Sequence, residues 1–267
     1  MVKVRLDTLL HQRGLFDSRS RAAASVMAGE VRVRGERASK AGQMVDDAVE
    51  VSVEEKPRFV SRGGVKLANA VAAFGVDVRG RRCLDVGAST GGFTDFLLQE
   101  GAAHVVAYDV AYGELHWSLR TDDRVTVVER ANARRIVASQ LPYAPDLIVA
   151  DVSFISLTKV LPAVLACASE SGFDCLAMVK PQFEVGRERV GSGGVVRDPA
   201  DRVGAFVAVA RAVRDASGCS VLGFASSGLA GPKGNLESFA WLAEGGRAGA
   251  LDDAGIEAAA AAVEGVA

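Results

Sequence analysis

Three residue types that often carry enzyme chemistry are scarce in this sequence. Among its 267 residues are three histidines, four cysteines and 6% aromatic residues. His11, His104 and His116 are widely separated and stand in no pattern typical of a zinc site or a catalytic triad. The cysteines show no metal-ligand spacing either, so we expect reduced core thiols in a cytoplasmic protein and no bound metal.

Long apolar runs are missing as well. No stretch approaches the roughly 18 residues that a membrane-spanning helix needs. The first residues, Met-Val-Lys-Val-Arg-Leu-Asp, contain no apolar core of the kind found in signal peptides. With no cationic amphipathic segment in addition, the sequence argues against a membrane-active protein, and haemolysis is kept only as an alternative to be tested with purified protein.

Lysine is rare, and the basic residues are unevenly distributed. The chain has seven lysines against 24 arginines, and its net charge is −2. Residues 1–40 hold nine basic and four acidic residues, a local charge of +5, which leaves about −7 on the rest. A basic module joined to an acidic body is typical of a protein that grips a polyanion such as RNA.

The most informative stretch that is present lies at residues 83–101. A short apolar run ends in Asp85 and Gly87, a loop of small residues follows, and an apolar helix pattern continues to Gly101. This order predicts a strand, a glycine turn and a helix start, the usual setting for a nucleotide-like cofactor. The spacing Gly87-x-x-x-Gly91-Gly92 is not the dinucleotide pattern, and no P-loop lysine follows.

The acid before the loop favours one cofactor. A carboxylate at the strand end does not attract a pyrophosphate, which is also negative, whereas it attracts the positively charged amino group and sulfonium of S-adenosylmethionine. We therefore expect S-adenosylmethionine near Asp85. A plain glycine turn in an α/β protein is the other reading of the same residues.

We predict three parts along the chain: a small α+β unit at residues 1–55, a linker at 56–62 and a large domain at 63–267. In the small unit, the segment from Val4 to Leu10 is expected to begin a short helix, and Ser18 is expected to cap a second helix from Arg19 to Met27. In the large domain, strands alternate with helices, which predicts a mostly parallel sheet covered on both faces. The seven strands are predicted at residues 83–87, 105–109, 125–128, 146–151, 174–179, 221–226 and about 238–243.

The first unit resembles the S4-like RNA-binding domain. The resemblance is carried by Arg5-Leu6-Asp7, Gly14, Ser18-Arg19-Ser20-Arg21-Ala22, Gly29-x-Val31-x-Val33-x-Gly35 and Asp47. It implies that the unit binds structured RNA, and the candidate RNA-binding residues are Arg5, Arg19, Arg21 and Lys40. A solvated basic face is the alternative reading for Arg19 and Arg21.

Two lysines and two acids are predicted to meet at one edge of the large sheet. Asp151 and Lys180 end predicted strands, Lys66 follows a Gly-Gly turn, and Glu237 lies in a glycine loop after the sixth strand. Ligands bind at the carboxyl ends of strands in such sheets. A lysine that is held out of water near a second cation can accept a proton from a ribose hydroxyl. Two ordinary ion pairs would use the same residues.

The whole chain is similar to the TlyA family, which joins an S4-like domain to an FtsJ-like ribose 2′-O-methyltransferase domain. The matching segments are Val60-Ser-Arg-Gly-Gly-Val-Lys66-Leu, Leu84-Asp-Val-Gly-Ala-Ser-Thr-Gly-Gly-Phe-Thr94, Asp151-Val-Ser-Phe-Ile-Ser156, Val179-Lys-Pro-Gln-Phe-Glu184 and Gly231-Pro-Lys-Gly-Asn235. The resemblance implies a Rossmann-like class I methyltransferase with a Lys66-Asp151-Lys180-Glu237 catalytic set.

The resemblance also implies a substrate. It points to cytidine 2′-hydroxyls of small-subunit and large-subunit ribosomal RNA, and to a link with sensitivity to ribosome-binding cyclic peptide antibiotics. Family members have also been labelled haemolysins. A non-catalytic RNA-binding or ribosome-assembly factor with a remnant pocket is the alternative, although all four catalytic positions are occupied.

Further cofactor contacts are expected beyond the glycine loop. Asp109 is a candidate for the ribose hydroxyls, Asn132 for the adenine, and Asp151 for both cofactor and substrate; for the first two, a strand-end turn residue is the alternative. The full cofactor set is Asp85, Gly87, Ala88, Ser89, Thr90, Gly91, Asp109, Asn132 and Asp151. The short linker Pro57-Arg58-Phe59-Val60 is a candidate for coupling RNA docking to the cofactor pocket, although the family form Arg-Ala-Trp-Val is replaced here.

Overall fold

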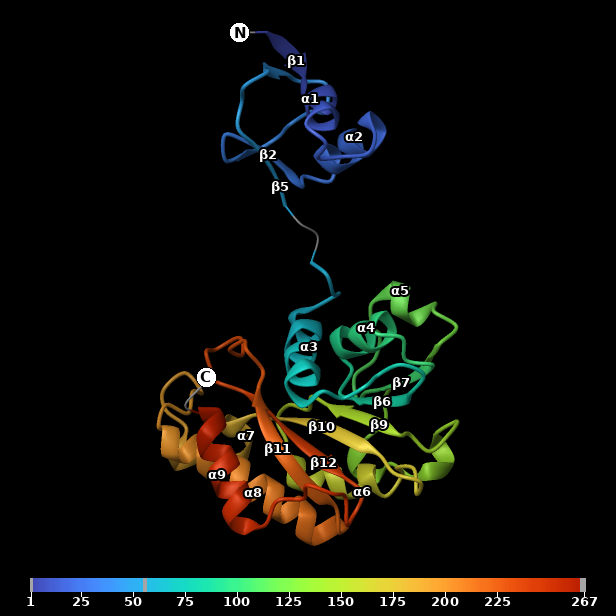
Figure 1. Ribbon diagram of the computed structural model, residues 1–267, viewed down its shortest axis with the longest axis vertical. Coiled ribbons are helices and arrows are strands. Elements are labelled where there is room, and N and C mark those ends of the chain that lie inside the picture. Colours follow the sequence, from blue (N-terminus) through green and yellow to red (C-terminus); the bar gives the residue numbers. More distant parts are fainter. Residues whose placement is uncertain (1, 55–56, 265–267) are drawn as a thin grey trace. The chain divides into compact units, whose positions relative to one another are not determined.

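The computed structural model divides the chain into two compact units, Met1–Arg58 and Phe59–Ala267 (Figure 1). It describes residues 2–54 and 57–264. The first residue of the predicted linker, Lys56, lies outside the described residues, and Phe59 already belongs to the second unit.

The first unit packs two helices beside two small sheets. Its elements are β1 (Lys3–Arg5), α1 (Leu6–Gln12), α2 (Arg19–Met27), β2 (Val31–Val33), β3 (Glu36–Arg37), β4 (Met44–Asp46) and β5 (Val51–Val53). Strand β1 pairs with β4, and β2 lies between β3 and β5. Leu6, Leu9 and Leu10 of α1 fill the core, which is why this short amphipathic segment is helical.

The sequence predicted the first helix from Val4, and this start is wrong. Lys3–Arg5 is a strand that pairs antiparallel with Met44–Asp46, so the helix begins at Leu6. The partner strand is distant in sequence, so the residue pattern of Lys3–Arg5 does not reveal this pairing. The predicted cap of the second helix is confirmed, since the Ser18 hydroxyl accepts a hydrogen bond from the Arg21 amide at 3.2 Å.

The second unit is built on a seven-stranded sheet in the order β11-β12-β10-β9-β6-β7-β8. Its strands are β6 (Arg82–Val86), β7 (His104–Tyr108), β8 (Val125–Val128), β9 (Leu147–Ala150), β10 (Asp174–Val179), β11 (Ser220–Ser226) and β12 (Ser238–Ala243). All pairs are parallel except those of β12, which runs antiparallel to both neighbours. The predicted α/β fold with a mostly parallel seven-stranded sheet is confirmed.

Helices cover both faces of this sheet (Figure 1). One face packs against α3 (Arg62–Phe74) and α4 (Gly92–Gln99), and the other against α6 (Leu161–Leu165), α8 (Pro199–Ser217) and α9 (Asp253–Glu264). The remaining helical segments are α5 (Trp117–Arg120), α7 (Pro181–Glu184) and the 3₁₀ turns η1 (Ala133–Arg135), η2 (Ala138–Gln140), η3 (Leu157–Lys159) and η4 (Arg187–Arg189).

Strand register brings the predicted site to one edge. Val86 of β6 is level with Ala150 of β9, so these two strands end together, whereas β10, whose Ala177 is level with Ala150, continues two residues further to Val179. Because β12 is antiparallel, its first residue Ser238 lies opposite Val179. The segment that precedes β12 therefore reaches the same edge as the segments that follow β6, β9 and β10.

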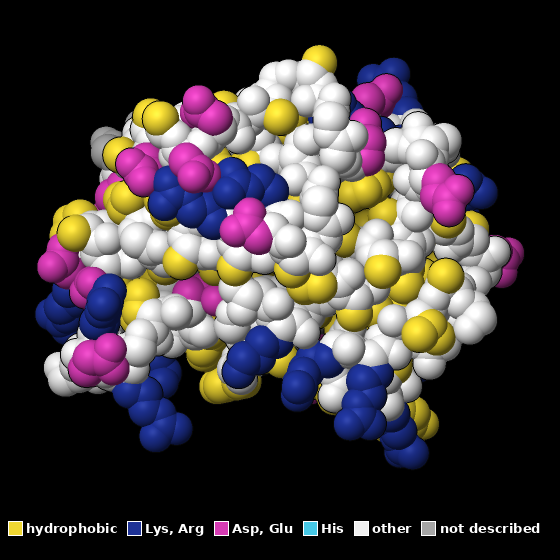
Figure 2. Space-filling view, turned by 90° about the horizontal axis from the view of Figure 1, so that it is seen from below, with side chains coloured by type: hydrophobic (Ala, Val, Ile, Leu, Met, Phe, Trp, Pro, Cys, Tyr) yellow, Lys and Arg dark blue, Asp and Glu magenta, His cyan; other side chains and the backbone are white. Residues whose placement is uncertain are grey.

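No helix in the described ranges is both long enough and apolar enough to cross a bilayer. In Figure 2, acidic and basic side chains lie together in a few mixed clusters among uncharged and apolar ones, and several Lys and Arg project along the lower edge of the view.

Candidate active site

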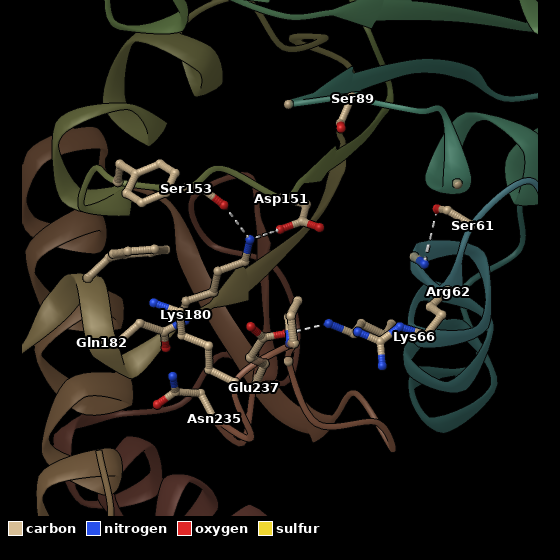
Figure 3. Close-up of a pocket in the computed structure, with 18 of the residues that line it drawn as sticks. Ser61, Arg62, Lys66, Ser89, Asp151, Ser153, Lys180, Gln182, Asn235 and Glu237 are labelled. Atoms are coloured by element: carbon tan, nitrogen blue, oxygen red, sulfur yellow. Dashed lines mark hydrogen bonds and ion pairs between the residues drawn. The ribbon is translucent and has the colours of Figure 1, made fainter. Parts of the chain in front are cut away.

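A cavity of about 610 Å³ opens at this edge of the sheet (Figure 3). It is bordered by the start of α3, the glycine loop after β6, the loop after β9, the segment from Lys180 through α7, and the loops at 190–194 and 231–237. Its size suits a small organic ligand. All four predicted catalytic residues line it.

Lys180 and Asp151 form the first charged pair of the cavity. Lys180 follows β10 and Asp151 follows β9, and the Lys180 ammonium pairs with Asp151 Oδ1. The same ammonium donates a hydrogen bond to Ser153 Oγ at 2.9 Å. In Figure 3 the Lys180 side chain extends toward both partners, so its nitrogen is held at the cavity wall by two neighbouring oxygens.

Lys66 and Glu237 form the second pair, which is more deeply buried. Lys66 stands on the first turns of α3 and Glu237 directly precedes β12, and their side chains are joined by an ion pair (Figure 3). The two residues are only 6% and 3% exposed. Gly231 leaves room for this carboxylate, because a Cβ at that position would lie 2.6 Å from Glu237 Oε1.

The two pairs share one electrostatic environment. Burial raises the pKa of the Asp151 carboxyl, and the positive charges of Lys180 and then Lys66 act against that rise. The negative charge of Glu237 acts in the same direction as burial. The pKa of Asp151 therefore depends on the charges of all three other residues of the set.

The glycine loop forms another wall. Gly87, Ala88, Ser89 and Thr90 line the cavity, whereas Gly91 does not and instead caps α4. Gly87 has φ +84°, and a Cβ there would lie 2.5 Å from the Asp151 carbonyl oxygen. Only glycine lets the loop approach the end of β9 this closely.

Asp85 is placed differently from the expectation of a ligand in the open cavity. It is fully buried, does not line the cavity, and accepts a hydrogen bond from Thr94 Oγ1 at 2.7 Å. Its other oxygen, Oδ1, has no hydrogen-bond partner among the described residues. Burial raises the pKa of Asp85 to about 7.

Asp109 and Asn132 also lie outside the main cavity. Asp109 borders a small recess next to Ala88 and Ser89, and its carboxylate accepts hydrogen bonds from the Ser89 and Ala111 amides, each at 2.7 Å. Asn132 is exposed, and its side chain accepts a hydrogen bond from the Arg134 amide at 3.0 Å. Asp109 is thus tied to the glycine loop, whereas Asn132 caps the η1 turn.

Sequence reasoning missed an aromatic pair on the rim. Phe154 follows β9 with φ +64° and is 92% exposed, although it lines the cavity. Its ring lies 5.3 Å from that of Phe183 on α7. A strained, exposed aromatic residue at a site is a signal of function that becomes visible only in the structure.

Glu184, which was not predicted as a site residue, stabilises the same rim. Its carboxylate accepts hydrogen bonds from Ser156 Oγ at 2.6 Å and from the Leu157 amide at 2.9 Å. The segment that carries Lys180 is thereby joined to the loop that carries Asp151 and Phe154.

The candidate RNA-binding residues belong to the first unit. Arg5 pairs with Asp7 at 2.6 Å, and Arg19 approaches the same carboxylate at 3.7 Å. Arg21 pairs with Asp17 at 2.5 Å, and Lys40 is exposed on the loop before β4. The structure therefore gathers Arg5 and Arg19 around one acid.

Two family models match the chain. An FtsJ-like methyltransferase model matches residues 59–244, and an S4 domain model matches residues 4–51. The residues of the first model include the whole cavity edge described above.

Individual proteins agree with these matches. The 16S/23S rRNA (cytidine-2′-O)-methyltransferase TlyA of Mycobacterium tuberculosis is 51% identical over 90% of each chain. The putative rRNA methyltransferase YqxC of Bacillus subtilis is 43% identical over 88% of this chain and 84% of its own. A solved structure titled as a putative hemolysin from Streptococcus thermophilus matches 99% of this chain and 97% of its own, with a TM-score of 0.73 and 40% identity.

The haemolysin label is an alternative name used within the same family. Since both domain models match in the expected order, and relatives align over nearly the full length, the chain belongs to the TlyA family, in which an S4 domain precedes an FtsJ-like methyltransferase domain.

Proposed function

We propose that this protein transfers a methyl group from S-adenosylmethionine to the 2′-hydroxyl of cytidines in ribosomal RNA. The observation that carries the proposal is the convergence of Lys66, Asp151, Lys180 and Glu237 on one cavity beside the glycine loop. The names of the TlyA relatives supply the nucleotide and the RNA, and direct the test to both ribosomal subunits.

The residues present fit the cofactor. The backbone of Gly87, Ala88, Ser89 and Thr90 offers a wall for the methionine end, and Asp109 lies behind this loop where ribose hydroxyls could reach it. Asp85 is buried beside this loop, and its Oδ1 atom, which has no partner among the described residues, leaves one acceptor unused near the methionine end. When bound, S-adenosylmethionine supplies an electrophilic methyl group.

Lys180 is proposed as the base of the reaction. In its neutral form, Nζ takes the proton of the attacking 2′-hydroxyl while the oxygen–carbon bond forms and the carbon–sulfur bond breaks, and the proton then passes to solvent. Asp151 and Ser153 hold Nζ in place. The positive charge of Lys66, itself fixed by Glu237, helps to keep the ribose oxygen deprotonated during attack.

The rim is suited to an unpaired nucleotide. Phe154 offers an exposed ring next to Phe183, and single-stranded or extruded bases stack on such rings. Arg62 and Lys233 line the same cavity and carry positive charge for the flanking phosphates. The basic first unit would supply the remaining grip on RNA.

The decisive experiment maps ribose methylation on purified 30S and 50S subunits treated with the protein and S-adenosylmethionine. We expect new 2′-O-methylcytidines with the wild-type protein. Lys180→Ala is expected to lower the rate by about 100-fold or more while cofactor binding persists, as for loss of a general base.

Lys159→Ala is the matched control, because this lysine is exposed on η3 and does not line the cavity. RNA binding without methylation by the wild-type protein would favour a non-catalytic assembly factor. Near-normal methyl transfer by Lys180→Ala would rule out Lys180 as the base.

A further inference from the structure

One polar side chain of the cavity has an unmet hydrogen-bonding need. Gln182 stands on α7, two residues after Lys180, and lines the cavity. Its Oε1 atom is buried and has no hydrogen-bond partner among the described residues. A buried acceptor without a donor is unfavourable and rare in folded proteins, so it calls for a ligand that supplies the donor.

The other carboxamide of the cavity shows the contrast. Asn235 donates to the Gly194 carbonyl at 2.8 Å and accepts from the Val196 amide at 2.9 Å. Its hydrogen-bonding capacity is used to join the loops at 190–194 and 231–237. Gln182 faces the same cavity with its acceptor free, which suits contact with a ligand better than a structural role.

The surroundings of Gln182 indicate which part of a nucleotide reaches it. Lys180 marks the position of the reacting ribose oxygen, and Gln182 follows it by two residues and lines the same cavity. Phe183 follows Gln182 directly and is paired with Phe154. Since a base is attached next to the ribose 2′-carbon, a base stacked at these rings would bring its edge to the Gln182 amide.

We propose that Gln182 determines base specificity by accepting a hydrogen bond from the exocyclic amino group of the target cytosine. Uracil has a carbonyl oxygen at that position, which would leave two acceptors facing one another. A site built around one hydrogen bond rejects an analogue that cannot make it. This inference rests on the proposed methyl transfer and adds the group that distinguishes cytidine from uridine.

The test is a cycle between protein and RNA variants. Methyl transfer is measured with RNA substrates that carry cytidine, uridine or N4,N4-dimethylcytidine at the mapped position, using wild-type protein, Gln182→Met and Gln182→Leu. With wild-type protein, kcat/KM is expected to fall by about 10- to 100-fold when the amino donor is absent, the effect of leaving a buried acceptor unpaired.

Gln182→Met is expected to slow transfer to cytidine by a similar factor and to leave transfer to the other two RNAs nearly unchanged. The preference for cytidine would then disappear, which a merely structural role of Gln182 does not produce. Gln140→Met is the matched control, because Gln140 is exposed on η2, away from the cavity.

Four outcomes are distinguished. An unchanged preference for cytidine in a Gln182 variant overturns the inference, and so does an equal loss on all three RNAs with cofactor binding intact. If one variant fails to bind S-adenosylmethionine because it misfolds, the other carries the comparison. Absence of any methylation by wild-type protein would contradict the proposed function itself.

Discussion

At the scale of single residues, the Lys66–Glu237 pair raises the question of whether its charges serve stability or chemistry. Both side chains are buried and form a direct ion pair in the wall of the cavity. Removing one member of such a pair leaves the other charge unpaired in a dry site. Replacing both by apolar side chains removes that penalty, so the two roles can be separated.

We expect Glu237→Gln to lower the free energy of unfolding by about 3–5 kcal/mol, measured by urea denaturation. Lys66→Met with Glu237→Leu is expected to regain most of this stability while methyl transfer stays lost. Glu257→Gln breaks an exposed pair with Arg211 and should cost less than about 1 kcal/mol. Recovery of activity in the double variant would mean that the pair is structural.

A second residue-scale prediction concerns Asp85. Because burial raises its pKa to about 7 from 3.8, the folded protein holds a proton there that the unfolded chain releases. Its contribution to stability is therefore present at pH 4 and is lost as the pH rises toward about 7. Asp85→Asn cannot titrate, so its stability relative to wild type should increase from pH 4 to pH 8.

Urea denaturation of both proteins across this pH range checks the Asp85 prediction. Thr94→Val is a useful companion, because it removes the hydrogen bond that Asp85 accepts without removing the carboxyl. A difference between Asp85→Asn and wild type that stays constant with pH would contradict the raised pKa.

Which single residues could be predicted depended on their position relative to strands. Lys180 and Asp151 could be predicted as site residues because short apolar runs in the sequence show where strands end. Phe154 and Gln182 were missed, because exposure, a positive φ and a missing hydrogen-bond partner are properties of the folded rim. Asp85 was read correctly as a strand-end acid, but its full burial depends on Thr94 and on packing that the local pattern does not contain.

At the scale of elements, the brace between α7 and the loop after β9 has a testable role. Burial raises the pKa of Glu184, and its carboxylate accepts hydrogen bonds from Ser156 and Leu157. Holding a carboxyl in this position is unfavourable unless its hydrogen bonds are kept. We infer that Glu184 positions Lys180 against Asp151 and supports the strained Phe154.

Glu184→Ala is expected to lower kcat for methyl transfer by about 10- to 100-fold with little change in cofactor affinity, because misplacement of reacting groups is costly. Glu184→Gln keeps an acceptor for the Leu157 amide and should restore much of the rate.

Glu244→Ala provides the matched control for the brace. Glu244 accepts a hydrogen bond from the Phe173 amide at 2.9 Å, just before β10, at the end of that strand opposite Lys180. The Glu244→Ala substitution should reduce the free energy of unfolding and leave kcat for methyl transfer unchanged. Equal effects of Glu184→Ala and Glu244→Ala on kcat would argue against positioning.

The order of elements was largely predictable, whereas pairing was not. Alternating strand and helix patterns predicted the large sheet, and Ser18 predicted a helix start. Strand β1 was mistaken for helix because its partner β4 is far along the chain. The antiparallel direction of β12 also follows from tertiary packing rather than from its own residues.

At the scale of the whole molecule, the division into two units predicts separable functions. Each unit has its own apolar core, so the segment from residue 57 onward is expected to fold alone. Without residues 1–56, S-adenosylmethionine binding should persist, while kcat/KM on ribosomal subunits should fall by about 10-fold or more for lack of phosphate contacts.

Isothermal titration with cofactor and methylation of subunits check this truncation together. The four-fold variant Arg5→Gln, Arg19→Gln, Arg21→Gln and Lys40→Gln is the companion in the full chain, because it removes charge without removing the unit. Full activity of the truncated protein would refute the docking role.

The linker prediction belongs to the same scale. Phe59 is 4% exposed and packs on Phe96, and a Cβ on Gly64 would lie 2.3 Å from its ring. The Val60 amide donates to Asp95 on α4 at 2.8 Å. Phe59 and Val60 are thus joined to α4, the helix that follows the glycine loop, so we expect a protein starting at residue 61 to bind cofactor more weakly than one starting at 57.

Equal cofactor affinity of these two truncated proteins, measured by titration, would remove the case for coupling. A Phe59→Leu variant of the longer protein separates the loss of the aromatic side chain from the loss of the segment.

The contact between Gly87 and the Asp151 backbone has a consequence for inhibitor resistance. Any side chain at position 87 would collide with the backbone of Asp151, the residue proposed to hold Lys180 in place. A substitution there that excluded a cofactor-competitive drug would also displace Asp151 and disable the enzyme. For compounds that contact this glycine, few resistance mutations at this position would therefore be compatible with activity.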